Sequence, residues 1–239
     1  MERPDPSILS QPLQDVLASA AHLQRVVPDA VLVGGAAAAL HARHRESFDH
    51  DVSDLVERYA EILEAVEAVE ATEGWVTSVR ASSPPLTLLG SLGGIEAGLR
   101  QLRRTRPLEV ERVTVPGSGT LTVPTRAEIL RVKAYLVVVR NQVRDYLDVV
   151  GLADRTGADP ASRVLAAIDE YYRDRSGEPD SVLTALVQRL AEPAPRDEPV
   201  TRQLASYKGL DPRWHRWESV ASACADLAER LLRIVEDAR

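Results

Sequence analysis

The sequence predicts an α+β protein in which a mixed sheet with helices is followed by a helical bundle. Short β-prone runs alternate with helical segments up to Val123, and the pattern becomes helical after Pro124. The 239 residues are 44% hydrophobic and 27% charged, which is typical of a globular chain long enough to bury its own core. We therefore expect an α/β domain over residues 1–124 and a helical domain over 125–239.

In the first half, apolar residues at helical spacing predict a helix over 11–26. A β-like run over 29–33 ends at two glycines, and an alanine-rich helix over 36–41 follows. A strand over 48–52 and a long amphipathic helix over 54–72 come next. Glycine- and proline-rich turns then separate five β-prone runs, 75–80, 86–90, 95–99, 108–115 and 120–123.

In the second half, Thr125 and Glu128 fit a capping box that opens a helix through Val139. Apolar periodicity predicts further helices near 141–155, 160–175, 179–191 and 212–238. The proline-rich stretch 192–199 is expected to be a surface linker within this helical half.

Composition excludes several classes of protein. The single cysteine, Cys224, allows neither an internal disulfide nor a cysteine-based zinc site. No apolar run is long enough to span a bilayer and no signal-peptide core follows Met1, so we expect a cytoplasmic protein without a membrane partner. The net charge of −7 argues against general coating of duplex DNA. Residues 100–106 nevertheless hold four arginines and no acid, which fits either a local RNA-binding patch or a solvated loop.

The first group of residues with chemical potential is Gly34-Gly35 followed by Asp49 and Asp51. Glycines between a strand and a helix let backbone N–H groups approach a phosphate. Two carboxylates two residues apart on a strand share one face, roughly 6.6 Å apart along the chain. Such a pair suits divalent cations such as Mg²⁺ and therefore phosphoryl-transfer chemistry.

The second group lies in the helical half. Lys133 sits on a strongly apolar helix, so its side chain either reaches solvent along its stem or points into a cleft. Lys133 and Lys208 are the only lysines in an arginine-rich chain, which favours a site that needs a compact ammonium at position 133. Asp145 and Asp148 are spaced to share a helix face, and the simplest alternative is a pair of surface charges.

Together the two groups resemble the AbiEii/MenT-type nucleotidyltransferase toxins of bacterial toxin–antitoxin systems. That family reads G-G-x-A-L-A-L-H and then H-R-x-S-x-D-x-D, and here the stretches are Gly34 to His41 and His44 to Asp51. A later K and R-D-x-x-D match Lys133 and the run from Arg144 to Asp148. The resemblance covers about residues 30–150 and implies a polymerase-beta-like nucleotidyltransferase fold in the first domain.

The resemblance also implies a site. Asp49 and Asp51 would hold Mg²⁺ or Mn²⁺, with Glu96 as the candidate third carboxylate. Asp148, or Asp145, would complete the site as base or substrate positioner. Residues near the NTP phosphates would be Gly34, Gly35, Arg45, Ser47 and Lys133. Family members transfer a nucleotide from an NTP to the 3′ end of tRNA, and an antitoxin protein is the expected partner.

Two features depart from the family pattern, and other functions stay open. His50 stands where the residue between the aspartates is usually aliphatic, and Glu96 is longer than the usual aspartate. A small-molecule, antibiotic nucleotidyltransferase and a non-catalytic protein of the same fold are the alternatives. A zinc or iron site built from His41, His44 and His50 with a nearby aspartate is a further one.

Overall fold

The computed structural model describes the chain except residues 1–5, 7–8, 45–48, 53–54, 69–73, 79–81, 102–103, 105, 173–180, 208 and 238–239. At 49–52 and 55–56 it describes the backbone and not the side chains. The chain forms two compact units. The first comprises Met1–Leu40, Glu46–Arg103 and Pro107–Thr125, and the second comprises His41–Arg45, Arg104–Arg106 and Arg126–Arg239. The second unit thus contains two short segments from the first half of the sequence.

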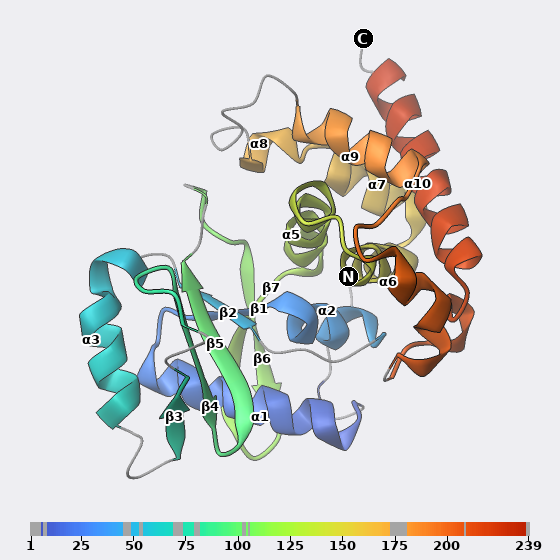
Figure 1. The fold of residues 1–239 in the computed structure, drawn as a ribbon. Coiled ribbons are helices and arrows are strands. Elements are labelled where there is room, and N and C mark those ends of the chain that lie inside the picture. Colours follow the sequence, from blue (N-terminus) through green and yellow to red (C-terminus); the bar gives the residue numbers. More distant parts are fainter. Residues whose placement is uncertain are drawn as a thin grey trace. The chain divides into compact units, whose positions relative to one another are not determined.

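The first unit is a mixed sheet with helices, as the sequence predicted (Figure 1). Its strands are β1 (Val31–Val33), β2 (Asp49–Val52), β3 (Trp75–Thr77), β4 (Thr87–Leu92) and β5 (Ile95–Gln101), in the order β1-β2-β5-β4-β3. Only the β2–β5 pair among these is parallel. The helices are α1 (Gln11–Val26), α2 (Gly34–Ala42) and α3 (Leu55–Ala68), and α2 ends in the second unit.

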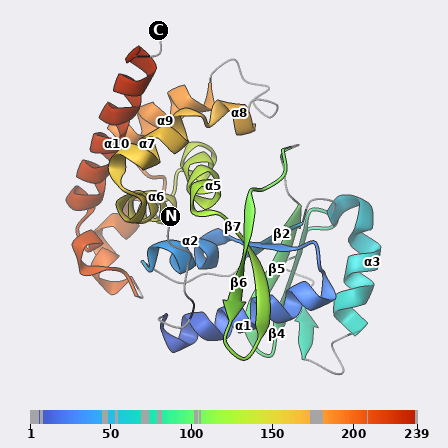
Figure 2. The ribbon, with the colours of Figure 1, turned by 180° about the vertical axis from the view of Figure 1, so that it is seen from behind.

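A separate hairpin, β6 (Val110–Val115) and β7 (Gly119–Pro124), completes the first unit and lies beside α1 in the reverse view (Figure 2). Gln24 of α1 joins the two elements. Its side-chain amide donates to the Thr122 carbonyl at 2.8 Å and accepts from the Thr122 N–H at 2.7 Å. A nearly buried glutamine therefore satisfies the backbone of a strand in the way a neighbouring strand would.

The second unit is helical. Its elements are α5 (Arg126–Val139), α6 (Val143–Thr156), α7 (Ala158–Ala166), α8 (Asp169–Tyr172), α9 (Val182–Ala191), the 3₁₀ helices η3 (Glu198–Ser206) and η4 (Pro212–Trp214), and α10 (Trp217–Asp237). The helix expected over 160–175 is interrupted after Ala166, and Asp169 accepts a hydrogen bond from the Leu183 N–H at the start of α9. The helix expected over 212–238 begins as a 3₁₀ turn capped by Asp211.

The proline-rich stretch 192–199 is hydrogen-bonded to other residues of the second unit. Asn141 donates from its side chain to the Ala194 carbonyl, and the Asn141 carbonyl accepts from the Arg196 N–H at 2.7 Å. Asp197 accepts from the Val143 N–H at 2.8 Å and so satisfies one of the free N–H groups at the start of α6. The stretch fixes the N-terminus of the helix that carries Asp145 and Asp148.

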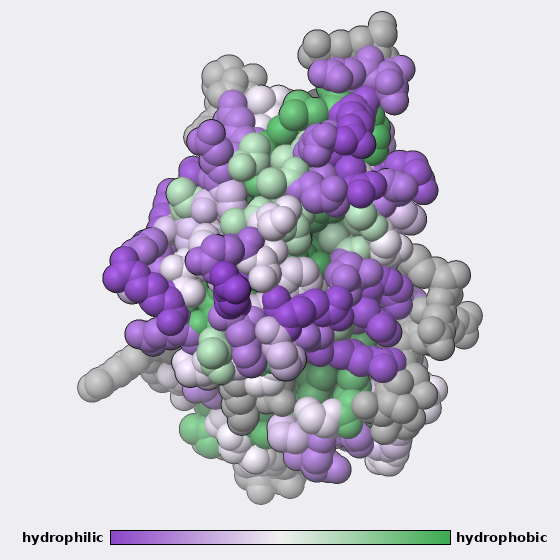
Figure 3. Space-filling view, turned by 90° about the vertical axis from the view of Figure 1, so that its right-hand side faces the viewer, coloured by the Kyte–Doolittle hydropathy of each residue, from purple (hydrophilic) through white to green (hydrophobic). Residues whose placement is uncertain are grey.

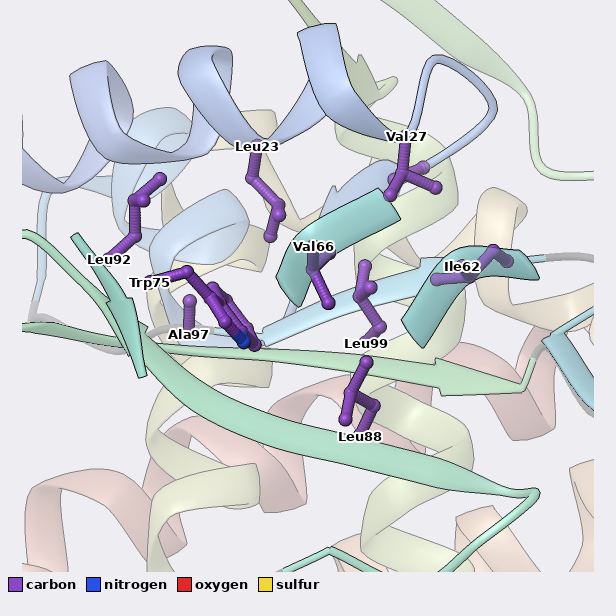
Figure 4. Packing of buried hydrophobic residues seen from close by; sticks show 10 residues of the cluster. Leu23, Val27, Ile62, Val66, Trp75, Leu88, Leu92, Ala97 and Leu99 are labelled. Carbon is purple, nitrogen blue, oxygen red and sulfur yellow. The ribbon is translucent and has the colours of Figure 1, made fainter. Parts of the chain in front are cut away.

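The core of the first unit lies between the sheet and two helices (Figure 4). Leu23 of α1, Val27 directly after this helix, and Ile62 and Val66 of α3 face apolar side chains from β3, β4 and β5. The strand residues of this core are Trp75, Leu88, Leu92, Ala97 and Leu99. Because alternate strand residues point to opposite faces, Glu96 and Arg100 project from the face of β5 away from this core.

Among the described residues, no helix is long and apolar enough to cross a bilayer. On the face in Figure 3, hydrophilic residues alternate with smaller groups of apolar ones.

Packing around Trp75 gives a stability prediction. A Cβ placed on Gly90 would lie 2.5 Å from Trp75 Cζ2 and 2.6 Å from the Val76 carbonyl oxygen. Gly90→Ala should therefore lower the free energy of unfolding by about 2 kcal/mol, because a buried ring and a backbone atom must both move. Urea denaturation followed by circular dichroism measures the loss.

The control for this change is Gly93→Asn. Gly93 has a φ of 59°, and no atom lies within 4 Å of its would-be Cβ. Asparagine tolerates this left-handed conformation, so the control should cost clearly less than Gly90→Ala. Equal costs for the two variants would contradict the packing argument.

Candidate functional site

The glycine pair lies where a strand turns into a helix, as expected. β1 ends at Val33, α2 begins at Gly34, and Gly34 has a φ of 70°, which an L-residue with a side chain rarely adopts. The alanines 36–39 that follow are fully buried. The turn brings backbone N–H groups to the start of α2, and the role of Gly34 and Gly35 in nucleotide binding stays a prediction.

Asp49 and Asp51 lie on β2, between two neighbouring strands. The register places Val33 opposite Asp49 and Val31 opposite Asp51 on β1, and Arg100 opposite Asp51 on β5. Glu96 is exposed near the start of β5, opposite Ser91 of β4. Arg45 and Ser47 lie outside the described residues, and so do the side chains of Asp49, His50 and Asp51. The metal-binding set therefore stays a prediction.

The described side chains, which do not include these two aspartates, contain no group of three or more His, Cys, Asp or Glu residues able to hold a metal ion.

The second unit brings two side chains, His44 and Lys133, to the carboxylate of Asp148. Asp148 Oδ1 lies 2.6 Å from His44 Nε2, and Asp148 Oδ2 lies 2.7 Å from Lys133 Nζ. The exposed fractions are 1% for His44, 3% for Lys133 and 0% for Asp148. His44 follows α2, Lys133 lies on α5 and Asp148 on α6. Lys133 thus does not reach solvent, and its ammonium is held by a buried carboxylate.

A glycine makes room for this arrangement. Gly151 lies one turn after Asp148 on α6, and a Cβ there would be 3.0 Å from His44 Cγ and 3.3 Å from His44 Cβ. The His44 ring therefore packs directly against the α6 backbone. Sequence reasoning missed Gly151, because a single glycine in a helix is a weak signal. It also assigned His44 to the family motif and to an alternative metal site, and not to a contact with Asp148.

Asp145 is buried as well, so the two aspartates are not surface charges. Neither of its carboxylate oxygens accepts a hydrogen bond from a described residue. Burial raises the pKa of the Asp145 carboxyl above its ordinary value, against the lowering effect of Lys133 and Arg140. A buried carboxyl with a raised pKa next to a cation is typical of functional sites.

The arginines of residues 100–106 are not all available to a ligand. Arg104 is 2.6 Å from Glu128, which is 0% exposed and also lies 3.0 Å from Arg131. Arg106 and Arg131 each lie 3.9 Å from the ring centroid of Tyr171. The expectation of a basic patch or a solvated loop is therefore wrong for Arg104, whose charge is used inside the second unit.

The capping box at the start of α5 also differs from expectation. In such a box the Glu128 side chain would accept a hydrogen bond from the Thr125 N–H. Here the Thr125 N–H donates to the Glu109 carbonyl at 2.8 Å.

Comparison with known proteins leaves the family open. No family model matches the chain. It is 36% identical over 131 residues to the mycolic acid-containing lipids exporter MmpL11 of Mycolicibacterium smegmatis. It is also 36% identical over 137 residues to the heme uptake protein MmpL11 of Mycobacterium tuberculosis, and 33% identical over 138 residues to the probable transport protein MmpL11 of Mycobacterium leprae.

The matches involve 55% to 57% of this chain and 13% of each relative. The chain thus spans a small part of the curated relatives it matches, and the transport activities in their names belong to those proteins.

Similarity to solved structures is partial. An example is the crystal structure of an antigenic nucleotidyltransferase-like protein from Paracoccidioides brasiliensis, with a TM-score of 0.44 and 16% sequence identity. The match covers 74% of this chain and 94% of the other. A likeness at this TM-score decides neither the fold nor the function of this chain.

The contact between His44 and Gly151 predicts that the effect of Gly151→Ala on stability has opposite signs with and without the histidine side chain. Gly151→Ala should destabilise the protein by about 1–2 kcal/mol, because the added methyl group displaces a buried ring. In a His44→Ala background the same change should stabilise it by up to about 1 kcal/mol, since alanine is the better helix former. Chemical denaturation of the four proteins of this cycle measures both effects. The same sign in both backgrounds would show that the ring does not require the glycine.

The raised pKa of Asp145 gives a pH prediction. A carboxyl group whose pKa is higher in the folded state than in the unfolded state lowers the free energy of unfolding as pH rises above the unfolded-state pKa. The reason is that ionisation is less favourable in the folded state. Asp145→Asn removes this penalty. Its effect on the free energy of unfolding should therefore be more favourable at pH 7 than at pH 4, as measured by urea denaturation at both values. An equal effect at the two pH values would contradict the assignment.

Proposed function

We propose that the chain is a metal-dependent nucleotidyltransferase that transfers a nucleotide from an NTP to an acceptor. One observation carries the proposal: a strand, a glycine turn with positive φ, a helix and a second strand follow one another, and the second strand bears Asp49 and Asp51. A glycine turn beside a D-x-D strand joins a phosphate-binding turn to a pair of hard oxygen ligands. The proposed acceptor is the 3′ end of tRNA, with the protein acting as a toxin, as the motif resemblance implies.

The donor set fits Mg²⁺ or Mn²⁺. Asp49 and Asp51, with Glu96 as a third candidate, offer the carboxylate oxygens that hard divalent ions prefer. When bound, such ions neutralise charge on the phosphates and on the departing pyrophosphate. In this proposal Gly34, Gly35, Arg45 and Ser47 bind the phosphates.

The buried pair in the second unit supplies a fixed positive charge. Lys133 carries a compact ammonium whose position is set by Asp148 at 2.7 Å. A preorganised cation stabilises charge that develops on phosphate oxygens without reorganising during the reaction. Both Asp148 oxygens are engaged by Lys133 and His44, whereas Asp145 has two oxygens that no described residue engages. Of the two candidate bases, the geometry therefore favours Asp145 for accepting a proton and Asp148 for positioning.

A labelling experiment tests the proposal. The purified protein is incubated with each α-³²P-labelled NTP, Mg²⁺ and total tRNA. Label should enter tRNA with at least one NTP, and EDTA should abolish incorporation. Asp49→Asn and Asp51→Asn should each lower the rate at least about 100-fold, the loss expected when a group stabilising transition-state charge is removed. Asp15→Asn, at an exposed aspartate of α1, is the control and should leave the rate unchanged.

The other outcomes distinguish the alternatives. Label on an aminoglycoside instead of tRNA would identify a small-molecule nucleotidyltransferase. No label on either acceptor, together with no NTP binding, would identify a non-catalytic protein. Full activity of Asp49→Asn would overturn the metal assignment.

A further inference from the structure

We propose that His44 is a positioning residue of the second unit, which fixes the carboxylate of Asp148 and, through it, the ammonium of Lys133. The structural part of this inference stands on the contacts of the second unit. Its catalytic consequence rests on the proposed function.

The first observation is how the Asp148 carboxylate is held. One oxygen lies 2.6 Å from His44 Nε2 and the other lies 2.7 Å from Lys133 Nζ. The two partners come from different segments, since His44 follows α2 and Lys133 lies on α5. A carboxylate with both oxygens engaged by separate elements cannot rotate without breaking a charge-assisted hydrogen bond. Removing His44 takes this hydrogen bond away from Asp148 Oδ1 and weakens the hold on the carboxylate. Lys133 would then lose its defined position.

The second observation is the space built for the ring. Gly151 lets His44 lie against α6, where any side chain would place a Cβ 3.0 Å from the ring. Glycine in a helix interior lowers helix stability, so this position exchanges local stability for a close approach of the histidine. The close packing of the His44 ring therefore depends on the glycine at position 151.

The third observation concerns the proton. His44 Nδ1 is buried, and no described residue accepts a hydrogen bond from it. Asp148 Oδ1 lies 2.6 Å from Nε2, at the distance at which the carboxylate accepts a hydrogen bond from an Nε2–H group. His44 therefore donates one hydrogen bond to Asp148, and a glutamine, whose side-chain nitrogen reaches about as far as Nε2, can replace this donor. Asparagine has the same chemistry and a shorter reach.

The composition of the chain allows a direct measurement. Lys133 and Lys208 are the only lysines, so ¹⁵N-lysine labelling gives two side-chain ammonium signals. Lys208→Arg assigns them. We expect the Lys133 signal to be shifted or broadened in His44→Asn and restored in His44→Gln, with the Lys208 signal unchanged in both. His215→Asn is the control, because His215 bonds to the Leu210 carbonyl at 3.0 Å and not to Asp148.

The same variants are then assayed for nucleotidyl transfer. His44→Asn should lower kcat about 10-fold to 100-fold with little change in the KM for NTP, and His44→Gln should recover most of the rate. Thermal melts followed by circular dichroism confirm that the variants fold. Should His44→Asn fail to fold, Gly151→Ala keeps the histidine, displaces its ring and should produce the same change in the Lys133 signal.

The outcomes separate this inference from the proposed function. An unchanged Lys133 signal in His44→Asn overturns the positioning role, whatever the activity. A changed signal with equal kcat in His44→Asn and His44→Gln overturns its catalytic consequence. A wild-type protein that transfers no nucleotide overturns the proposed function, while the lysine signals still decide whether His44 positions Asp148.

Discussion

Two carboxylates with no exposed surface, Asp148 and Glu128, carry the organisation of the second unit. Each joins a cation on α5 to a residue from a distant segment: Asp148 joins Lys133 to His44, and Glu128 joins Arg131 to Arg104. A buried charge is tolerated only when it is paired and hydrogen-bonded, and removal of one partner typically costs about 3–5 kcal/mol. The rest of the site depends on these pairs, since they fix α5 and the segments around His44 and Arg104.

These pairs change how the charge of the chain is interpreted. The run 100–106 is the most basic stretch, yet Arg104 neutralises Glu128 and Arg106 and Arg131 lie against Tyr171. Tyr171 and Tyr172 are buried, and Tyr172 stacks on Tyr135 at 4.1 Å, so these rings belong to the core. Cation–π and ion-pair contacts of this kind stabilise the fold and take arginines away from any nucleic acid. Arg104 is therefore not part of a surface that would bind the proposed acceptor.

The α+β class and most helices and strands were predictable, because periodicity and turn residues are local signals. The break after Ala166 was not, since no glycine or proline marks it and its cause includes a contact between Asp169 and the distant Leu183. Residue type and spacing were enough to single out Lys133, Asp145 and Asp148 as candidates. Their burial and the identity of their partners were not predictable, because His44 lies 104 positions from Asp148 and only tertiary structure brings them together. Gly151 gave no usable signal, since its importance arises only from the ring beside it.

The placement of segments 41–45 and 104–106 in the second unit affects how the chain can evolve and how it can be expressed in parts. Both are encoded within the first half, yet both belong to the second compact unit. A cut at residue 125 would separate Glu128 from Arg104 and Asp148 from His44. The two units are therefore not interchangeable modules joined by one linker. Expression of residues 126–239 alone would deprive Glu128 of Arg104 and Asp148 of His44, although Arg131 and Lys133 would remain. We therefore expect the two units to be inherited, folded and lost together.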